Sequence, residues 1–161
     1  MKGKNQDLVQ KGTINPATID KRNLAGETPL FSACSNNNIE LASRLLEKGA
    51  QVNAQDPIGY APLHRAAERG YEDLCTLLLR YKASVNITTN TFLTPLYIAA
   101  FNGKVKICEM LLKNRANVDQ ADALNQTPLH AAASQGHRAV CKLLLQHGAS
   151  SDARNRDGSD Q

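Results

Sequence analysis

Short amphipathic segments alternate with polar turns along the chain, and one turn–helix–helix pattern follows another. Residues 62–70, PLHRAAERG, predict a short helix whose alanines let another helix pack closely. A second helix follows, with the leucine pair Leu78-Leu79 at helical spacing. An extended Val-Asn stretch then leads into a turn such as DPIG at 56–59. The pattern predicts an all-α fold built from repeated helix-turn-helix units.

The units recur with a constant period. Prolines stand at 29, 62, 95 and 128, each 33 residues after the last. Three of them lie in the tripeptide TPL and one in the variant APL at 61–63. Leucine pairs keep the same interval at 45–46, 78–79, 111–112 and 144–145. A period that holds over four copies indicates a repeat architecture, in which each unit buries its apolar face against its neighbours.

Each unit carries helix start and stop signals. Threonine before proline suits a helix start, because the hydroxyl caps free N–H groups and proline fits the first turn. Ala61 lacks this cap. Glycine, or Asn37 in the first unit, ends the first helix in the left-handed conformation.

Several residues depart from the pattern where glycine is expected. Lys82 and Arg115 replace the glycine that follows the leucine pair, and Phe92 and Asn125 replace the glycine of the turn. A left-handed backbone at Lys82 or Arg115 costs about 1 kcal/mol.

The motifs APLHRA at 61–66 and TPLHAA at 127–132 resemble the ankyrin repeat. The resemblance implies an all-α repeat solenoid of stacked helix-turn-helix repeats with extended β-turn tips. It covers four copies, at 23–55, 56–88, 89–121 and 122–154. Residues 1–22 form a basic arm with a degenerate repeat end, and 155–161 start a further, truncated repeat. A window cut from a longer array and an array with degenerate ends both fit.

Net charge and the lack of long apolar runs exclude several classes of function. The net charge is +4, of which +3 lies in residues 1–22, so the body has no basic face for nucleic acid. Binding through that arm is a second hypothesis, but it offers no aromatic stacking platform. No apolar run has the length of a membrane span, and no secretory signal is visible. We expect a cytoplasmic protein that is not secreted, with a nuclear location left open.

Residues with reactive side chains have structural interpretations. Cys75, Cys108 and Cys141 share one register with Ala42, which indicates a small core site, and no CxxC spacing suggests zinc. Phosphate-binding glycine motifs and a nucleophile with its base are also missing from the sequence. We therefore expect no enzyme activity, no cofactor and no metal. In the resembled family the histidine at His64 and His130 ties neighbouring turns by hydrogen bonds.

The resemblance implies a concave groove lined by turn tips and the outer ends of the first helices. Its predicted partner-binding residues are Ile58, Tyr60, Arg69, Thr91, Leu93, Phe101, Leu124, Gln126 and Gln135. The expected function is a protein-interaction scaffold or adaptor for a protein or peptide, with the oligomeric state left open. Alternatively, the chain is the recognition segment of a larger enzyme, ligase subunit or channel. The resemblance also makes Asn53 and Asn86 candidates for asparaginyl hydroxylation.

Overall fold

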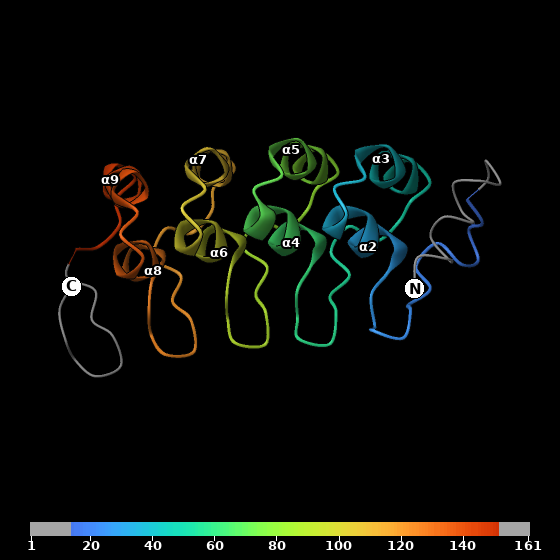
Figure 1. Cartoon of the computed structure of the whole chain (residues 1–161), viewed down its shortest axis with the longest axis horizontal. Coiled ribbons are helices and arrows are strands. Elements are labelled where there is room, and N and C mark those ends of the chain that lie inside the picture. Colours follow the sequence, from blue (N-terminus) through green and yellow to red (C-terminus); the bar gives the residue numbers. More distant parts are fainter. Residues whose placement is uncertain (1–13, 152–161) are drawn as a thin grey trace. The chain divides into compact units, whose positions relative to one another are not determined.

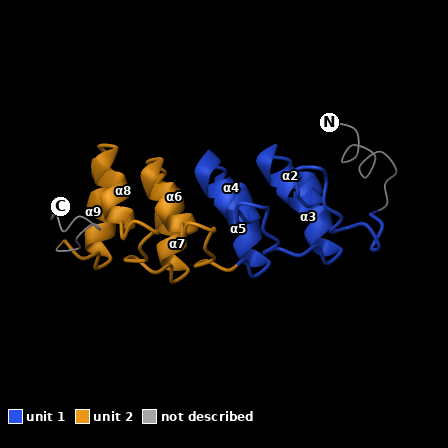
Figure 2. Cartoon of the chain, turned by 90° about the horizontal axis from the view of Figure 1, so that it is seen from below, with its two compact units in different colours: residues 1–83 blue, residues 84–161 orange. Residues whose placement is uncertain are grey.

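The computed structural model describes residues 14–151. The predicted start of a further repeat at 155–161 lies outside the described residues, as does most of the basic arm. The described part contains eight α-helices and no strands, which confirms the predicted all-α repeat fold. The chain divides into two compact units, residues 1–83 (unit 1) and 84–161 (unit 2), coloured separately in Figure 2.

Unit 1 contains two helix pairs. The first helices are α2 (Pro29–Ser35) and α4 (Pro62–Arg69), and the second helices are α3 (Ile39–Glu47) and α5 (Glu72–Arg80). Within each pair the helices pack on one another, while α2 also packs on α4 and α3 on α5. First and second helices therefore form two layers, and the turns extend from the first layer (Figure 1).

Unit 2 repeats this arrangement. Its first helices are α6 (Pro95–Phe101) and α8 (Pro128–Ser134), and its second helices are α7 (Val105–Lys113) and α9 (Arg138–Gln146). Here α6 packs on α8 and α7 on α9. The 33-residue period of the sequence thus becomes a period of helix pairs within each unit.

The predicted helix caps are present at the threonines. The hydroxyls of Thr28, Thr94 and Thr127 accept from the backbone N–H three residues on. Ala61 provides no side-chain cap to α4, so the predicted loss is confirmed.

The two TPLH-type histidines bind locally. His64 Nδ1 accepts from Ala61 N at 2.9 Å, and His130 Nδ1 accepts from Thr127 N at 2.9 Å. Each bond joins the histidine to the start of its own helix. A bond from either histidine to a neighbouring turn stays a prediction.

The core consists mainly of leucine and small residues. Leu45, Leu78, Leu111 and Leu144, one from each pair, have no exposed surface. Cys34, Cys75 and Cys108 are buried and all four cysteines are free. Burial raises the pKa of each of these three thiols to about 12, so they are neutral packing groups. Cys141 is only partly buried.

The predicted left-handed positions are confirmed. Lys82 and Arg115 both have φ of 67°, Phe92 has φ of 64° and Asn125 has φ of 63°. The repeat backbone therefore keeps its conformation where the sequence has lost glycine, at an expected cost of about 1 kcal/mol for a side chain such as Lys82. Among residues 14–151, no helix is long and apolar enough to cross a bilayer.

Candidate binding surface

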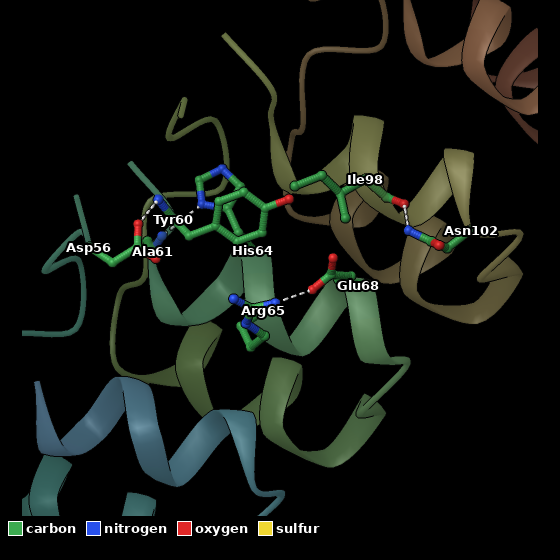
Figure 3. A network of polar contacts seen from close by, with 8 residues as sticks. All are labelled: Asp56, Tyr60, Ala61, His64, Arg65, Glu68, Ile98 and Asn102. Atoms are coloured by element: carbon green, nitrogen blue, oxygen red, sulfur yellow. Dashed lines mark hydrogen bonds and ion pairs between the residues drawn. The ribbon is translucent and has the colours of Figure 1, made fainter. Parts of the chain in front are cut away.

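One residue organises each turn tip. In the second repeat, Asp56 N donates to Tyr60 O at 2.8 Å and Gly59 N donates to Asp56 O at 2.9 Å. The carboxylate Oδ1 of Asp56 also accepts from Ile58 N at 3.1 Å. It accepts from Tyr60 N at 2.8 Å as well, as Figure 3 shows. The tip is thus a β-turn in which Gly59 has a left-handed backbone. The side chain of Asp56 stabilises the turn by accepting from two of its N–H groups.

The same four bonds occur in the other three turns. Asn23, Thr89 and Asp122 take the place of Asp56, each with its side-chain oxygen accepting from the backbone N–H groups two and four residues on. These residues were not among those predicted from the sequence. Their signal was present, because Asn, Asp or Thr recurs there every 33 residues.

In unit 1 the surface beside the turn tip is built around Arg65 of α4. Its guanidinium carbon lies 5.4 Å from the centre of the Phe31 ring and 5.1 Å from that of Tyr60. Arg65 Nη1 also forms an ion pair with Glu68 Oε2 at 2.5 Å (Figure 3). The Arg65 side chain is only 20% exposed, so this cation is held by two rings and a carboxylate.

Of the three binding residues predicted in unit 1, Ile58 is 58% exposed at the turn tip. Arg69 is exposed at the end of α4. Tyr60 is half-buried, its ring centre 5.5 Å from that of His64. Burial is the main reason why the pKa of Tyr60 is raised. Arg65 was not predicted from the sequence; it stands where other repeats have serine, isoleucine or alanine.

In unit 2 the two turn tips are joined directly. Ala123 N donates to Thr91 O at 3.0 Å, and Tyr97 Oη donates to Asp122 Oδ2 at 3.0 Å. Burial raises the pKa of Tyr97, and the neighbouring Asp122 carboxylate raises it further, so the phenol stays protonated as a donor. These bonds fix neighbouring tips in one register.

The six binding residues predicted in unit 2 divide by exposure. Phe101 at the end of α6 is 43% exposed and Leu124 at a turn tip is 56% exposed. Thr91 and Gln135 are exposed, whereas Leu93 and Gln126 are half-buried. These exposures are compatible with contact to a partner, which stays a prediction.

One exposed residue of unit 2 was missed. Phe92 is 56% exposed at the turn tip, directly after Thr91. The sequence analysis noted it as a departure from glycine but did not place it in the binding surface. A large apolar side chain at a left-handed tip position was the signal.

The end of α6 that carries Phe101 is fixed from the next repeat. His137 Nε2 hydrogen bonds to Phe101 O at 3.0 Å, with the carbonyl as acceptor. A Cβ atom on Gly103 would stand 2.7 Å from the His137 ring, so glycine leaves room for the imidazole. Phe101 is therefore presented on a braced helix end.

Asn86 links the end of the second repeat to the end of the third, through residues that all lie in unit 2. Its Oδ1 accepts from Asn117 N at 2.8 Å and its Nδ2 donates to Arg115 O at 3.4 Å. Asp20 and Asp119 use the same oxygen to accept from the backbone 31 residues on. The Asn86 register position thus has a structural role, and hydroxylation of Asn53 or Asn86 stays a prediction.

No group of three or more His, Cys, Asp or Glu side chains within residues 14–151 is placed to hold a metal ion. The chemistry available at the turn tips and first-helix ends is that of apolar contact, hydrogen bonding and one braced cation.

A family model described as ankyrin repeats (3 copies) matches residues 1–89 and again residues 88–155. A search among curated proteins finds no match.

Proposed function

The chain belongs to the ankyrin-repeat family, and from this premise we propose that it is a protein-interaction scaffold whose turn tips and first-helix ends bind a protein or peptide. Ankyrin repeats generally mediate protein–protein interaction and are typically non-catalytic. In unit 1 the proposed binding residues are Ile58, Tyr60 and Arg69; in unit 2 they are Thr91, Phe92, Leu93, Phe101, Leu124, Gln126 and Gln135.

The observation that carries the proposal is the exposure of large apolar side chains at positions the core does not use. Ile58, Phe92, Phe101 and Leu124 are each 43–58% exposed, whereas one leucine of each pair is fully buried, namely Leu45, Leu78, Leu111 and Leu144. Exposing such side chains to water is unfavourable, and clusters of them usually mark an interaction site. Aromatic anchors surrounded by polar groups are also typical of binding hot spots.

Hydrogen bonds prepare this surface for binding. The side chain of Asp122 holds its own turn and accepts from Tyr97, and His137 braces the helix end at Phe101. A surface held in place loses little conformational entropy when a partner binds, so its apolar contacts contribute more fully to affinity.

The test is affinity capture from cells with the chain and with Phe101→Ala plus Leu124→Ala. We expect the captured partner to bind the double variant at least about 30-fold more weakly, since the loss of even one hot-spot residue costs about 2 kcal/mol or more. Ile39→Ala is the matched control, because Ile39 is an exposed apolar residue of a second helix. Circular dichroism verifies that both variants fold.

Undiminished binding by the folded double variant would reject this surface. A second variant, Tyr60→Ala plus Phe101→Ala, tests whether a residue of unit 1 contributes to binding. The partner can also be tested against a longer protein that contains this chain. If substitutions at the turn tips do not weaken binding there, the alternative of a recognition segment with a different surface is favoured.

Nucleic-acid binding through the basic arm is the second candidate. Arg22, a cation of that arm, already donates to the carbonyls of Gly26 at 2.7 Å and Gln55 at 2.6 Å. This contact holds Arg22, the last residue of the arm, against the turns of unit 1 and leaves one cation fewer for phosphates. A gel shift that weakens steeply with salt would support nucleic-acid binding, and its absence at low salt would end it.

A further inference from the structure

Among the four first helices that the structure describes, one alone carries charged side chains. Helix α4 contains Arg65, Glu68 and Arg69, whereas α2, α6 and α8 contain no Asp, Glu, Lys or Arg. The other repeats have uncharged residues in the register of Arg69, namely Asn36, Asn102 and Gln135. The repeat fold therefore does not require charge on a first helix, and the two cations of α4 need a separate explanation.

Arg65 is a mostly buried cation whose donors are incompletely used. Its side chain is 20% exposed, and its Nη1 binds Glu68 Oε2 (Figure 3). Its Nε is buried and has no hydrogen-bond partner among residues 14–151. A guanidinium has five N–H donors, and a buried donor without an acceptor is unfavourable. Glu68 thus balances the charge of Arg65 but leaves part of its hydrogen-bonding capacity unused.

Arg69 has no counter-charge in the part of the chain that the structure describes. It is exposed in the last turn of α4, and its guanidinium forms no ion pair with any of residues 14–151. It stands four residues after Arg65, so the two side chains lie on the same side of the helix. Like charges at this spacing destabilise a helix slightly, which makes helix stability a poor reason for the pair.

The acidic side chains in the turns and first helices of unit 1 are already engaged. Glu27 Oε2 accepts from Ser32 Oγ at 3.4 Å, Asp56 Oδ1 accepts from the N–H groups of its own turn, and Glu68 pairs with Arg65. None of these contacts involves Arg69. The charge that remains on this surface is therefore positive, which is complementary to an anionic group.

The helix dipole gives a simpler explanation for one of the two cations. A cation in the last turn of a helix is favourable, and Arg80 has that position in α5 just as Arg69 has it in α4. The dipole does not account for Arg65, which lies in the first half of α4. Arg80 therefore provides a control that separates the dipole effect from binding.

We propose that the unit 1 part of the binding surface recognises an Asp or Glu side chain of a protein or peptide partner through Arg69 and Arg65. The inference rests on the proposed function, because it names the chemistry of the partner at that same surface. The carboxylate pairs with Arg69 and is attracted by the charge of Arg65, while an apolar neighbour in the partner contacts Tyr60. Arginine and tyrosine are enriched in binding hot spots, and the two rings that hold Arg65 reduce the entropy lost on binding.

The probe is a library of short random peptides displayed on phage and selected on the whole chain. The same selection is carried out on Arg69→Asn, which introduces the residue that α2 and α6 are followed by at this register. We expect peptides selected on the unsubstituted chain to be enriched in Asp or Glu beside an apolar residue. This enrichment should be lost on the variant.

Selected peptides are then synthesised and titrated by fluorescence polarisation. We expect Arg69→Asn to weaken binding about 10-fold at low salt and less at high salt, because salt screens an exposed charge pair. Arg80→Asn removes the same charge from the last turn of a second helix and should have little effect. Glu68→Gln removes the carboxylate that competes for Arg65 and should strengthen binding.

Several results would overturn the proposal. They are a selection without acidic enrichment, equal weakening by Arg69→Asn and Arg80→Asn, and weaker binding by Glu68→Gln. Circular dichroism verifies that each variant folds. If the selected peptides lack acidic residues and lose binding only in Phe101→Ala plus Leu124→Ala, the interaction scaffold stands and this proposal alone fails.

Discussion

The two units carry different chemistry on the same backbone. In unit 1 the surface beside the turn tips is organised by a cation, Arg65, between Phe31 and Tyr60. In unit 2 the residue in the register of Arg65 is Ile98, which is buried, and the tips are joined by the neutral donor Tyr97. Unit 1 has glycine at both left-handed tip positions, whereas unit 2 has Phe92 and Asn125.

The difference shows which positions of the repeat are free to vary. The threonine cap, the buried leucine and the side chain that closes the turn are needed in nearly every copy, because each satisfies backbone groups or fills the core. The tip and the outer first-helix positions carry no such requirement. Variation at the tip between Gly59 and Phe92 changes what a partner meets without changing the fold.

The largest effect is expected from substitutions in the core, which test whether the two units unfold separately. Leu78→Ala in unit 1 and Leu111→Ala in unit 2 each remove a fully buried side chain, and each should cost about 2–5 kcal/mol. Because repeats interact chiefly with their neighbours, we expect amide hydrogen exchange to rise more in the unit that carries the substitution. Equal loss of protection throughout the chain would mean that the units unfold as one.

A smaller effect concerns the helix caps. Thr94→Ala should lower the free energy of unfolding by about 1 kcal/mol, and Ala61→Thr should raise it by about the same amount. The second change copies the arrangement of Thr127 and His130 onto Ala61 and His64. Urea denaturation measures both changes. Thr127→Ala removes the same kind of cap from the other first helix of unit 2 and is compared with Thr94→Ala. A loss of stability in Ala61→Thr would show that α4 has no room for the hydroxyl.

The smallest change in structure, and the clearest difference between units, concerns the thiols. Both cysteines of unit 1 are buried, whereas unit 2 has one buried and one half-buried, Cys141 in α9. We expect a thiol reagent at pH 8 to label Cys141 first and the other three only after unfolding, with Cys141→Ala removing the fast phase. Fast labelling of Cys75 in the native state would contradict the structure.

The same thiols give a pH dependence with a definite sign. Burial raises the pKa of Cys34, Cys75 and Cys108 from 9.0 to about 12. Above about pH 9 the unfolded chain loses these protons while the folded chain keeps them, so their contribution to stability falls as the pH rises towards 12. Cys75→Ala should reduce this slope, and Cys141→Ala should change it less.

The local structure could be read from the sequence because its causes are local. The threonine that caps a helix and the proline after it act within one turn. The constant spacing of the prolines places such a helix start in every repeat. The left-handed backbone at Lys82 and Arg115 followed from register alone, since the same position is glycine in the first and last copies. Ala61 was recognised as a missing cap for the same reason.

The candidate surface could be read only in part. Exposed apolar residues such as Ile58 and Leu124 stood out against the repeat pattern. Phe92 could have been predicted as well, because a large apolar side chain in place of the turn glycine must lie at the surface of the tip. The braced cation Arg65 was missed because it depends on Phe31, more than thirty residues earlier.

The sequence by itself determined the all-α repeat architecture, the start and stop signals of the first helices and the positions that must adopt unusual backbone angles, since these follow from interactions within a few residues. Only the tertiary structure decided which side chains meet across repeats and which stay open. Tyr97 with Asp122 and Arg65 between two rings both depend on contacts between segments far apart in the chain. Periodicity specifies each unit, but burial depends on what lies next to it.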